Sequence, residues 1–327
     1  MLMNYKYVIA GADNDFYDIA FNDVRNKDKN ITYLRTAMDY SNPVIRFLRN
    51  RHFSGRANNI INLPGKFIWN RFTFENPYKN TDKICFVIFG ANYARYVELG
   101  VFESLRKRYP GCKIVCYFQD LASKCGYSYP EKLKDHFDLI LSFDQKDCDM
   151  YGWIYYPLVY SEVHIEDDDD IPESDVYFVG KAKDRLSEII SFFEKCDAAG
   201  LKCDFHIVGV PKENQVFKNK ISYCGQMPYE ENLKRIRKTR CMLEIMQQGG
   251  HGYTLRYCEA IAMGKKLATN NPEIEKAPFY NKKFISVFKS VEEFDPQFIL
   301  NGDREVDYNY LPELSPLKLV EFIDARI

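Results

Sequence analysis

QQGGHGYTLRYCEAIAMGKKLATNN, residues 247–271, is the stretch that decides the fold of this chain. It opens with a glycine-rich run, whose missing Cβ atoms let backbone N–H groups approach a ligand closely. A helix follows that carries Arg256 and Glu259, three residues apart and therefore near one face. The helix stops at Gly264, and a strand is predicted over 265–269. A glycine-rich loop leading into a helix is typical of a phosphate site, because the helix N-terminus gathers unpaired N–H donors and partial positive charge.

Continuous apolar runs alternate with helix-length segments along the whole chain. Such runs are the signature of parallel strands buried on both faces of a sheet. In the first half the sequence predicts a helix centred on 97–108, stopped by Pro110-Gly111, and strands over 6–11, 83–90, 113–118 and 137–143. In the second half it predicts helices over 184–199 and 229–240, and strands over 175–180, 205–209, 221–225, 241–246, 265–269 and 284–288.

An acidic segment separates the two halves. SEVHIEDDDDIPES, residues 161–174, is typical of a solvated linker, because a cation site would need interleaved oxygen ligands or a glycine turn. A length of 327 residues suits two domains, so we expect lobes over 1–160 and 175–310 with a ligand cleft at their strand ends. The helix expected over 311–327 is a candidate to pack back on the first lobe.

Composition excludes several classes of protein. The formal net charge is −1, which gives no global field for nucleic acid. The N-terminus lacks the apolar core of a signal peptide. The sequence contains no run of about 18 apolar residues, so we expect no membrane-spanning helix. The ten cysteines contain no CxxC pair, which favours buried structural thiols in a reducing cytoplasm.

Three segments carry a resemblance to a known family: 178–185 (FVGKAKDR), 221–229 (ISYCGQMPY) and 248–259 (QGGHGYTLRYCE). Together with 143–147 and 155–158, which look like a crossing between lobes, they resemble the GT-B glycosyltransferases. These enzymes are α/β proteins with two Rossmann-like parallel-sheet lobes. More narrowly, the chain is similar to those of bacterial capsule, exopolysaccharide and lipopolysaccharide assembly. The motifs cover most of the second lobe, and the first lobe matches by architecture only.

In that family the second lobe holds the nucleotide-sugar donor. The resemblance implies that Glu259 accepts hydrogen bonds from the ribose hydroxyls and that the nucleobase lies near Gly225 and Met227. It makes cationic side chains candidates for the diphosphate, where they would stabilise charge on the leaving group. The candidates are Arg256, Lys181 and Arg185, with Gly252, Tyr253 and Thr254 as further donors.

Each assignment has a structural alternative. Glu259 on the helix surface would pair with Lys265 or Lys266, and Arg256 would form only a salt bridge to Glu259. Lys181 and Arg185 lie at a helix start, where aspartate is favoured and lysine is not, and this mismatch favours an anionic ligand.

One position departs from the family pattern. Many retaining GT-B enzymes carry a Glu-x7-Glu pattern, and here His251 stands eight residues before Glu259 in place of the first glutamate. His251 is a candidate contact of the donor sugar or phosphate, or it fills a turn. Retention and inversion are both left open.

The first lobe is expected to bind the acceptor. An inverting enzyme needs a general base there, and Asp13 and Asp120 are candidates because each follows a predicted strand. The alternative for both is a loop or helix-capping role. Asp13-Asn-Asp15 matches the Asp-x-Asp metal motif of GT-A transferases only superficially, so we expect neither a metal nor a cofactor.

Residues 40–74 contain no aspartate or glutamate but are rich in basic and aromatic side chains. These are Arg46, Arg49, Arg51, Arg56, Lys66, Arg71, Phe47, Phe53, Phe67 and Trp69. Residues 44–72 are therefore a candidate contact with an anionic membrane that displays lipid-linked acceptors; the alternative is a segment packed on the first lobe. No RNA-binding module is recognisable, and we expect no nucleic-acid partner.

The leading hypothesis is a cytoplasmic, metal-independent glycosyltransferase of hexosyltransferase type, peripheral on the inner face of the membrane. It would move a sugar from a UDP-linked donor to a surface polysaccharide or lipid-linked glycan. The alternatives are a UDP-sugar epimerase of the same architecture, which turns over the donor without an acceptor, and a non-catalytic glycan-binding scaffold.

Overall fold

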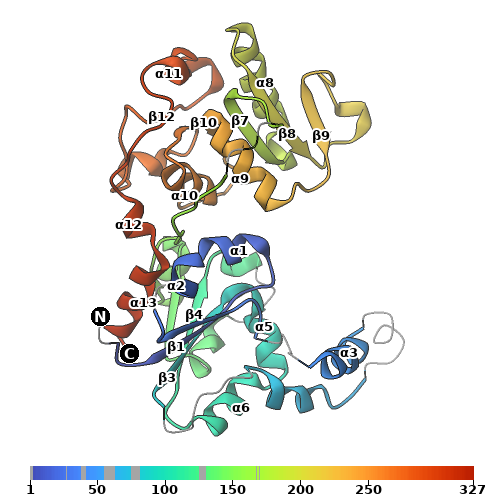
Figure 1. The fold of residues 1–327 in the computed structure, drawn as a ribbon, viewed down its shortest axis with the longest axis vertical. Coiled ribbons are helices and arrows are strands. Elements are labelled where there is room, and N and C mark those ends of the chain that lie inside the picture. The colour runs from blue at the N-terminus through green and yellow to red at the C-terminus, as the bar shows by residue number, and fades with distance from the viewer. Residues whose placement is uncertain are drawn as a thin grey trace. The chain divides into compact units, whose positions relative to one another are not determined.

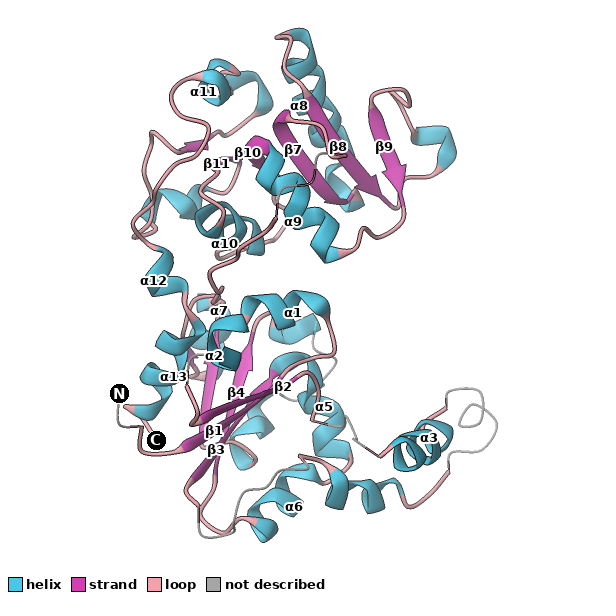
Figure 2. Cartoon of the chain, in the orientation of Figure 1, coloured by secondary structure: helices cyan, strands magenta, loops and turns pink. Residues whose placement is uncertain are grey.

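The computed structural model describes residues 3–26, 28–37, 42–54, 63–74, 82–124, 130–166, 168 and 170–327. The chain divides into two compact units (Figure 1): unit 1 is Met1–Val159 with Pro316–Ile327, and unit 2 is Tyr160–Ser315. Each unit contains one parallel sheet accompanied by helices (Figure 2). The predicted fold class, α/β with two Rossmann-like parallel sheets, is confirmed.

The sheet of unit 1 has the strand order β2-β1-β3-β4-β5-β6, with every neighbouring pair parallel. Its strands are β1 (Lys6–Ala10), β2 (Ile31–Leu34), β3 (Ile84–Phe89), β4 (Lys113–Phe118), β5 (Leu139–Ser142) and β6 (Ile154–Tyr155). Every residue of β3 is buried, as expected for a central parallel strand covered on both faces. The order of winding reverses between β1 and β3, which makes that position the topological switch point of the sheet.

Helices connect these strands. They are α1 (Asp15–Ala20), α2 (Asn22–Asn26), α3 (Pro43–His52), α5 (Gly90–Glu98), α6 (Val101–Arg108), α7 (Gln145–Tyr151) and α13 (Pro316–Asp324), with 3-10 helices η1 (Lys66–Phe72), η2 (Ala122–Lys124) and η3 (Pro130–Asp135). α5 packs on β3, β4 and α6, while α2 packs on β2 and on the C-terminal helix α13.

The last helix of the chain, α13, belongs to the first unit. Leu319, Val320 and Ile323 are fully buried, and Asp324 accepts a hydrogen bond from the Tyr7 hydroxyl at 2.7 Å. Asp324 also accepts from the backbone N–H of Asn4 at 3.0 Å, so the two ends of the chain lie together on unit 1 (Figure 1).

The sheet of unit 2 has the order β12-β11-β10-β7-β8-β9, again wholly parallel. Its strands are β7 (Ser174–Lys181), β8 (Cys203–Val208), β9 (Ile221–Cys224), β10 (Thr239–Glu244), β11 (Lys266–Thr269) and β12 (Ile285–Val287). The helices are α8 (Leu186–Ala198), α9 (Tyr229–Lys238), α10 (Leu255–Ala262), α11 (Gln297–Leu300) and α12 (Leu311–Leu314), with η4 (Lys183–Arg185), η5 (Lys212–Asn214), η6 (Pro272–Lys276) and η7 (Val291–Glu293). α8 buries Ile189, Phe192, Phe193 and Cys196, the spacing of one amphipathic face.

Three predicted boundaries are wrong in detail. The helix expected over 97–108 is divided between α5 and α6, because Gly100 takes a left-handed conformation with φ of 65°. The strand expected over 241–246 covers Thr239–Glu244, so the helix before it ends at Lys238. The helix expected over 311–327 is split before Pro316, whose ring nitrogen cannot donate a helical hydrogen bond.

The predicted linker 161–174 includes the first residue of β7, Ser174, and residues 167 and 169 lie outside the described residues. Throughout the part of the chain that the structure describes, no helix combines the length and the apolar character needed to cross a bilayer.

Candidate functional site

In unit 2 the carboxyl ends of β7 and β10 are neighbours at the topological switch point. The chain runs from β7 outward to β8 and β9 and then returns to the other side of β7 as β10. In open parallel sheets ligands bind outside such a point, because the loops that leave the two strands run in opposite directions. The glycine-rich stretch identified from the sequence follows β10 and therefore lies at this edge.

Glu244, the last residue of β10, is a buried acid at this edge. It is 3% exposed. One of its carboxylate oxygens accepts from the Thr254 hydroxyl, and the other accepts from the Thr269 hydroxyl at 2.5 Å. Burial raises the pKa of Glu244, and the two hydroxyl hydrogen bonds only partly offset that rise. Glu244 thus joins the ends of β10 and β11 to the start of α10.

The loop before α10 is closed by hydrogen bonds within the protein. Gly252, with φ of 73°, donates its backbone N–H to Glu273 Oε2 at 2.6 Å and accepts at its carbonyl from Asn271 Nδ2 at 3.0 Å. Thr254 is the N-cap of α10, and its Oγ1 accepts from the backbone N–H of Arg256 at 3.1 Å. The N–H of Gly252, predicted to contact a diphosphate, therefore already binds a carboxylate.

Tyr253 and His251 stabilise the same loop. The Tyr253 ring lies edge-on to the rings of Tyr257 and Phe279, with 5.3 Å between centroids in each pair. The His251 side chain is 35% exposed, and its Nδ1 is 3.8 Å from Glu273 Oε1. Glu273 thus lies within reach of two groups predicted to contact the donor, the His251 ring and the Gly252 N–H.

Arg256 and Glu259 are brought together as their spacing predicts. Arg256 Nη1 donates to Glu259 Oε2, and Arg256 Nη2 donates to the carbonyl of Val179 at 2.5 Å. The Arg256 side chain is 22% exposed, whereas that of Glu259 has no exposed surface. Arg256 therefore bridges α10 to the end of β7 at the switch point through hydrogen bonds from both terminal nitrogens.

Glu259 is held by α9 as well. Its Oε1 accepts from the Tyr229 hydroxyl at 3.0 Å and from Asn232 Nδ2 at 3.0 Å. The Tyr229 hydroxyl also shares a hydrogen bond of 2.6 Å with the Tyr160 hydroxyl, and burial raises the pKa of both tyrosines well above the usual range. With Arg256, three of the roughly four acceptor positions of the carboxylate are occupied. A ribose hydroxyl would reach Glu259 only if Tyr229 or Arg256 moved.

The alternative in which Glu259 pairs with Lys265 or Lys266 is wrong. Lys265 Nζ donates to the carbonyl of Arg237 at 2.9 Å and lies 3.6 Å from Glu305. Lys266 Nζ donates to two main-chain carbonyls at the end of α11, those of Ile299 and Asn301. Lys265 precedes β11 and Lys266 is its first residue, so both lysines lie at the end of the strand opposite to Thr269.

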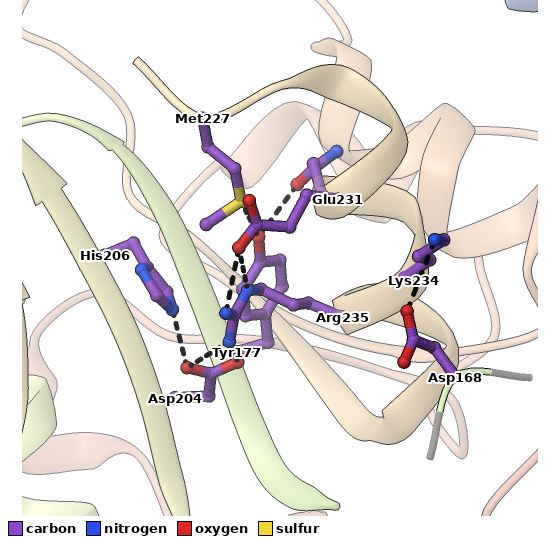
Figure 3. A network of polar contacts seen from close by, with 9 residues as sticks. Asp168, Tyr177, Asp204, His206, Met227, Glu231, Lys234 and Arg235 are labelled. Carbon is purple, nitrogen blue, oxygen red and sulfur yellow. Dashed lines mark hydrogen bonds and ion pairs between the residues drawn. The ribbon is translucent and has the colours of Figure 1, made fainter. Parts of the chain in front are cut away.

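Polar contacts fix α9 against β7 and β8 (Figure 3). The Tyr177 hydroxyl donates to Asn232 Oδ1 at 3.0 Å and lies 3.4 Å from the sulfur of Met227. Arg235 binds Asp204 at 3.0 Å, and Asp204 also binds His206 at 2.7 Å. The Tyr177 hydroxyl thus contacts both Met227, the candidate nucleobase contact in the loop before α9, and Asn232 of α9, which also binds Glu259. Gly225, the other candidate contact of the nucleobase, is exposed, and a Cβ atom there would meet nothing within 4 Å.

Lys181, the last residue of β7, and Arg185, the last residue of η4, differ in how accessible their side chains are to a ligand. Arg185 donates from Nη1 to the carbonyl of Ile245 and from Nη2 to the carbonyl of Lys181 at 3.3 Å, and burial lowers its pKa. Its hydrogen bonds tie the loop after β7 to the loop after β10. Lys181 itself is exposed at the end of β7. Of the two predicted diphosphate contacts, Lys181 presents the more accessible positive charge.

Comparison with solved structures identifies the architecture. A UDP-forming α,α-trehalose-phosphate synthase from Burkholderia xenovorans aligns over 98% of this chain and 98% of its own, with a TM-score of 0.51 and 12% identity. A trehalose-6-phosphate synthase aligns over 91% and 86% with a TM-score of 0.48 and 11% identity. An α-glucosyltransferase bound to UDP-glucose and DNA aligns over 98% and 89% with a TM-score of 0.47 and 12% identity.

The chain has the GT-B fold.

No family model matches the sequence, and no curated protein matches it. At 12% identity the likeness to the synthase extends to the GT-B fold alone. The narrower type predicted from the sequence, capsule, exopolysaccharide or lipopolysaccharide assembly, therefore stays a prediction.

In the first GT-B unit, Asp13 lies at the carboxyl end of β1, beside the switch point of that sheet. It is exposed, has φ of 49°, and receives Arg35 Nε at 2.7 Å. Arg35 also binds Asp15 at 2.8 Å and contacts Asp18. Asp13 does not cap α1, because that role belongs to Asn14. The structure thus shows a solvent-facing ion-pair cluster at the candidate base.

Asp120 follows β4, one strand farther from the switch point. Its Oδ1 accepts from the backbone N–H of Leu121 at 2.9 Å, a local loop contact. In the described ranges no group of three or more His, Cys, Asp or Glu side chains has the arrangement of a metal site. Metal independence and the role of either aspartate stay predictions.

Sequence reasoning missed Glu244, Glu273 and Tyr229. Glu244 carried a signal, because a glutamate inside the apolar run CysMetLeuGluIleMet is a charge placed where burial is expected. Glu273 and Tyr229 carried none, since their partners Gly252 and Glu259 lie 21 and 30 residues away in the chain.

Proposed function

We propose that this protein is a glycosyltransferase that transfers a sugar from a UDP-sugar to a surface-polysaccharide or lipid-linked glycan acceptor. The observation that carries the proposal is Arg256, anchored between Glu259 and the end of β7 at the switch point, with a side chain that is 22% exposed. A fixed cation beside a helix N-terminus is suited to a diphosphate leaving group. The choice of uridine is supported by the UDP-forming synthase that shares the fold.

In this proposal the side chains of unit 2 act by position and charge. Arg256 and Lys181 stabilise the negative charge that develops on the diphosphate as the glycosidic bond breaks. The N-terminus of α10, capped by Thr254, adds its partial positive charge. Glu259 accepts from the ribose once Tyr229 shifts, and His251 contacts the donor sugar or phosphate. The mechanism uses no metal and no resident cofactor.

The acceptor side of the reaction belongs to unit 1. Asp13 or Asp120 takes the proton of the acceptor hydroxyl if the transfer inverts the configuration of the anomeric carbon. For that role Asp13 must exchange its contact with Arg35 for the acceptor, because the ion pair holds the carboxylate at 2.7 Å. The protein acts in the cytoplasm, at the membrane where such acceptors are displayed.

A thermal-shift panel with UDP, GDP, CDP and ADP tests the donor site. We expect UDP to raise the melting temperature most. Lys181→Ala should weaken UDP binding about tenfold, because one charge-assisted contact is lost. Lys212→Ala is the matched control, since Lys212 is an exposed lysine of the same unit. If no nucleotide stabilises the protein, the proposal is wrong; equal binding by Lys181→Ala removes only that residue from the site.

Turnover distinguishes the proposed reaction from its alternatives. We expect release of UDP to depend on added lipid-extract or polysaccharide acceptor, and sugar label to appear in that acceptor. Interconversion of the UDP-sugar without acceptor would instead identify an epimerase. Nucleotide binding with neither reaction would favour the scaffold.

A further inference from the structure

Unit 1 carries a group of large apolar side chains that face solvent. In α3, Val44, Phe47 and Leu48 are 63%, 64% and 52% exposed, and in η1, Phe67 and Ile68 are 68% and 46% exposed. The first three lie at helical spacing i, i+3 and i+4, so they form one face of α3. Among the described residues these two short elements contain half of the large hydrophobic side chains that are exposed. Single exposed hydrophobics are ordinary, but a cluster marks an interaction surface.

The two elements are folded against each other and against the unit. The His52 ring, at the end of α3, accepts from Trp69 Nε1 at 2.9 Å and contacts the carbonyl of Pro64 at 3.0 Å. Ile45 and Phe53 pack against the core of unit 1. The inner side of α3, which Figure 1 shows as a helix of unit 1, is therefore anchored, and its exposed side chains lie on the other side.

Charge makes this region unlike the rest of the protein. Residues 40–74 contain six lysines and arginines and no aspartate or glutamate. The other residues contain 39 basic and 46 acidic side chains, a net charge of −7. Arg46 and Arg51 are exposed on α3 itself. We call Val44, Phe47, Leu48, Phe67 and Ile68, together with Arg46, Arg51 and Lys66, the α3–η1 surface.

We propose that the α3–η1 surface binds the surface of a bilayer that contains anionic lipids. Apolar side chains flanked by arginines are the composition of an interfacial element, whose hydrocarbon enters the headgroup boundary while the cations meet lipid phosphates. This inference rests on the membrane location proposed above and assigns it a surface, but it can fail separately from sugar transfer, since it uses none of the donor-site residues.

Two other occupants are less well matched. Single-stranded nucleic acid gains from stacking on aromatic rings, whereas Val44, Leu48 and Ile68 are aliphatic and gain only from hydrocarbon. A second copy of the chain would bring two basic regions together, and like charges oppose that contact.

Vesicle co-sedimentation of the full chain tests the proposal. We expect binding to vesicles that contain phosphatidylglycerol, little binding to pure phosphatidylcholine, and loss of binding at high salt. The double variants Phe47→Ser/Phe67→Ser and Arg46→Glu/Arg51→Glu should each lower the partition coefficient by more than about tenfold. All four substituted side chains are exposed. The melting temperatures of both double variants should therefore match that of the unsubstituted protein.

Matched controls are available elsewhere on the chain. Met150→Ser replaces an apolar side chain that is 70% exposed on α7, and Lys107→Glu/Lys289→Glu reverses two exposed charges; neither should change vesicle binding. Equal binding to both kinds of vesicle, or binding that survives both surface variants, overturns the proposal. Displacement of the protein from vesicles by single-stranded RNA would also overturn the proposal. A dimer in sedimentation that the Phe47→Ser/Phe67→Ser variant no longer forms would do the same.

Discussion

Glu244 is a carboxyl group placed where solvent hardly reaches it. Both of its oxygens accept from threonine hydroxyls that belong to other elements, Thr254 before α10 and Thr269 at the end of β11. Such a group organises the loop around it, because each hydroxyl has one preferred direction for its proton. In the proposed donor site Glu244 is a positioning residue, because its hydrogen bond is to Thr254 and it touches no proposed ligand atom.

The titration of Glu244 predicts a pH dependence of stability. Its pKa is raised in the folded protein by burial, so its contribution is fully present below the ordinary carboxyl pKa of about 4.3 and is lost as pH rises through the raised value. Glu244→Gln removes this titration. We therefore expect urea denaturation to show that the stability of the unsubstituted protein, relative to Glu244→Gln, declines as pH rises above about 4.

Glu273 occupies the position that the donor proposal assigns to an anion. Its carboxylate receives the Gly252 N–H and lies near His251. Glu273→Gln keeps the side-chain oxygen but removes the negative charge, so a diphosphate would no longer be repelled from the loop. We expect the affinity for UDP, measured by calorimetry, to rise about threefold to tenfold, because one like charge near a partly exposed site costs on the order of 1 kcal/mol. An affinity that falls or stays constant would place the diphosphate elsewhere.

At the scale of the element, α10 is a short helix whose start is specified by one side chain. Thr254 caps it by accepting from Arg256 N and at the same time donates to Glu244. Thr254→Ala should lower the free energy of unfolding by about 2 kcal/mol, since it removes the cap and leaves a buried acceptor without its donor. Thr254→Ser keeps the hydroxyl and should recover most of that loss in the same denaturation experiment. A mild effect of Thr254→Ala would show that the cap is dispensable.

The strands were predictable where their residues are continuously apolar. β3 is a run of this kind, as is β4 after its first residue Lys113, and burial follows directly from them. β2 (Ile31–Leu34) was not predicted, because its four residues form too short a run, and in the structure only Ile31 of them is buried. The break between α5 and α6 depends on the conformation of Gly100, which the helical pattern on either side conceals.

The candidate site was predictable as far as local spacing reaches. Arg256 and Glu259 meet because they are three residues apart on one helix. The complete burial of Glu259 depends on Tyr229 and Asn232, which come from α9 and are 30 and 27 residues away. No periodicity in the sequence reports contacts of that range.

For the whole molecule, the C-terminal helix predicts how stability is shared between the units. α13 buries Leu319, Val320 and Ile323 in unit 1, while residues 160–315, which directly precede it, form unit 2. Deletion of residues 316–327 exposes the surface of unit 1 that α13 covers, including part of α2, and removes the Tyr7–Asp324 hydrogen bond. We expect hydrogen exchange to accelerate in β1 and β2 and to stay unchanged in β7, β8 and β10. Acceleration in both units would mean that they unfold as one.

The return of α13 also has a consequence for the order of events during synthesis. Because translation proceeds from the N-terminus, residues 160–315 leave the ribosome complete, while the first unit still waits for its final helix. The unit that begins to emerge first is then the last to be finished. Until α13 arrives, the Tyr7 hydroxyl lacks its Asp324 acceptor and α2 lacks one of the helices that it packs on, so this side of unit 1 stays open longest during synthesis.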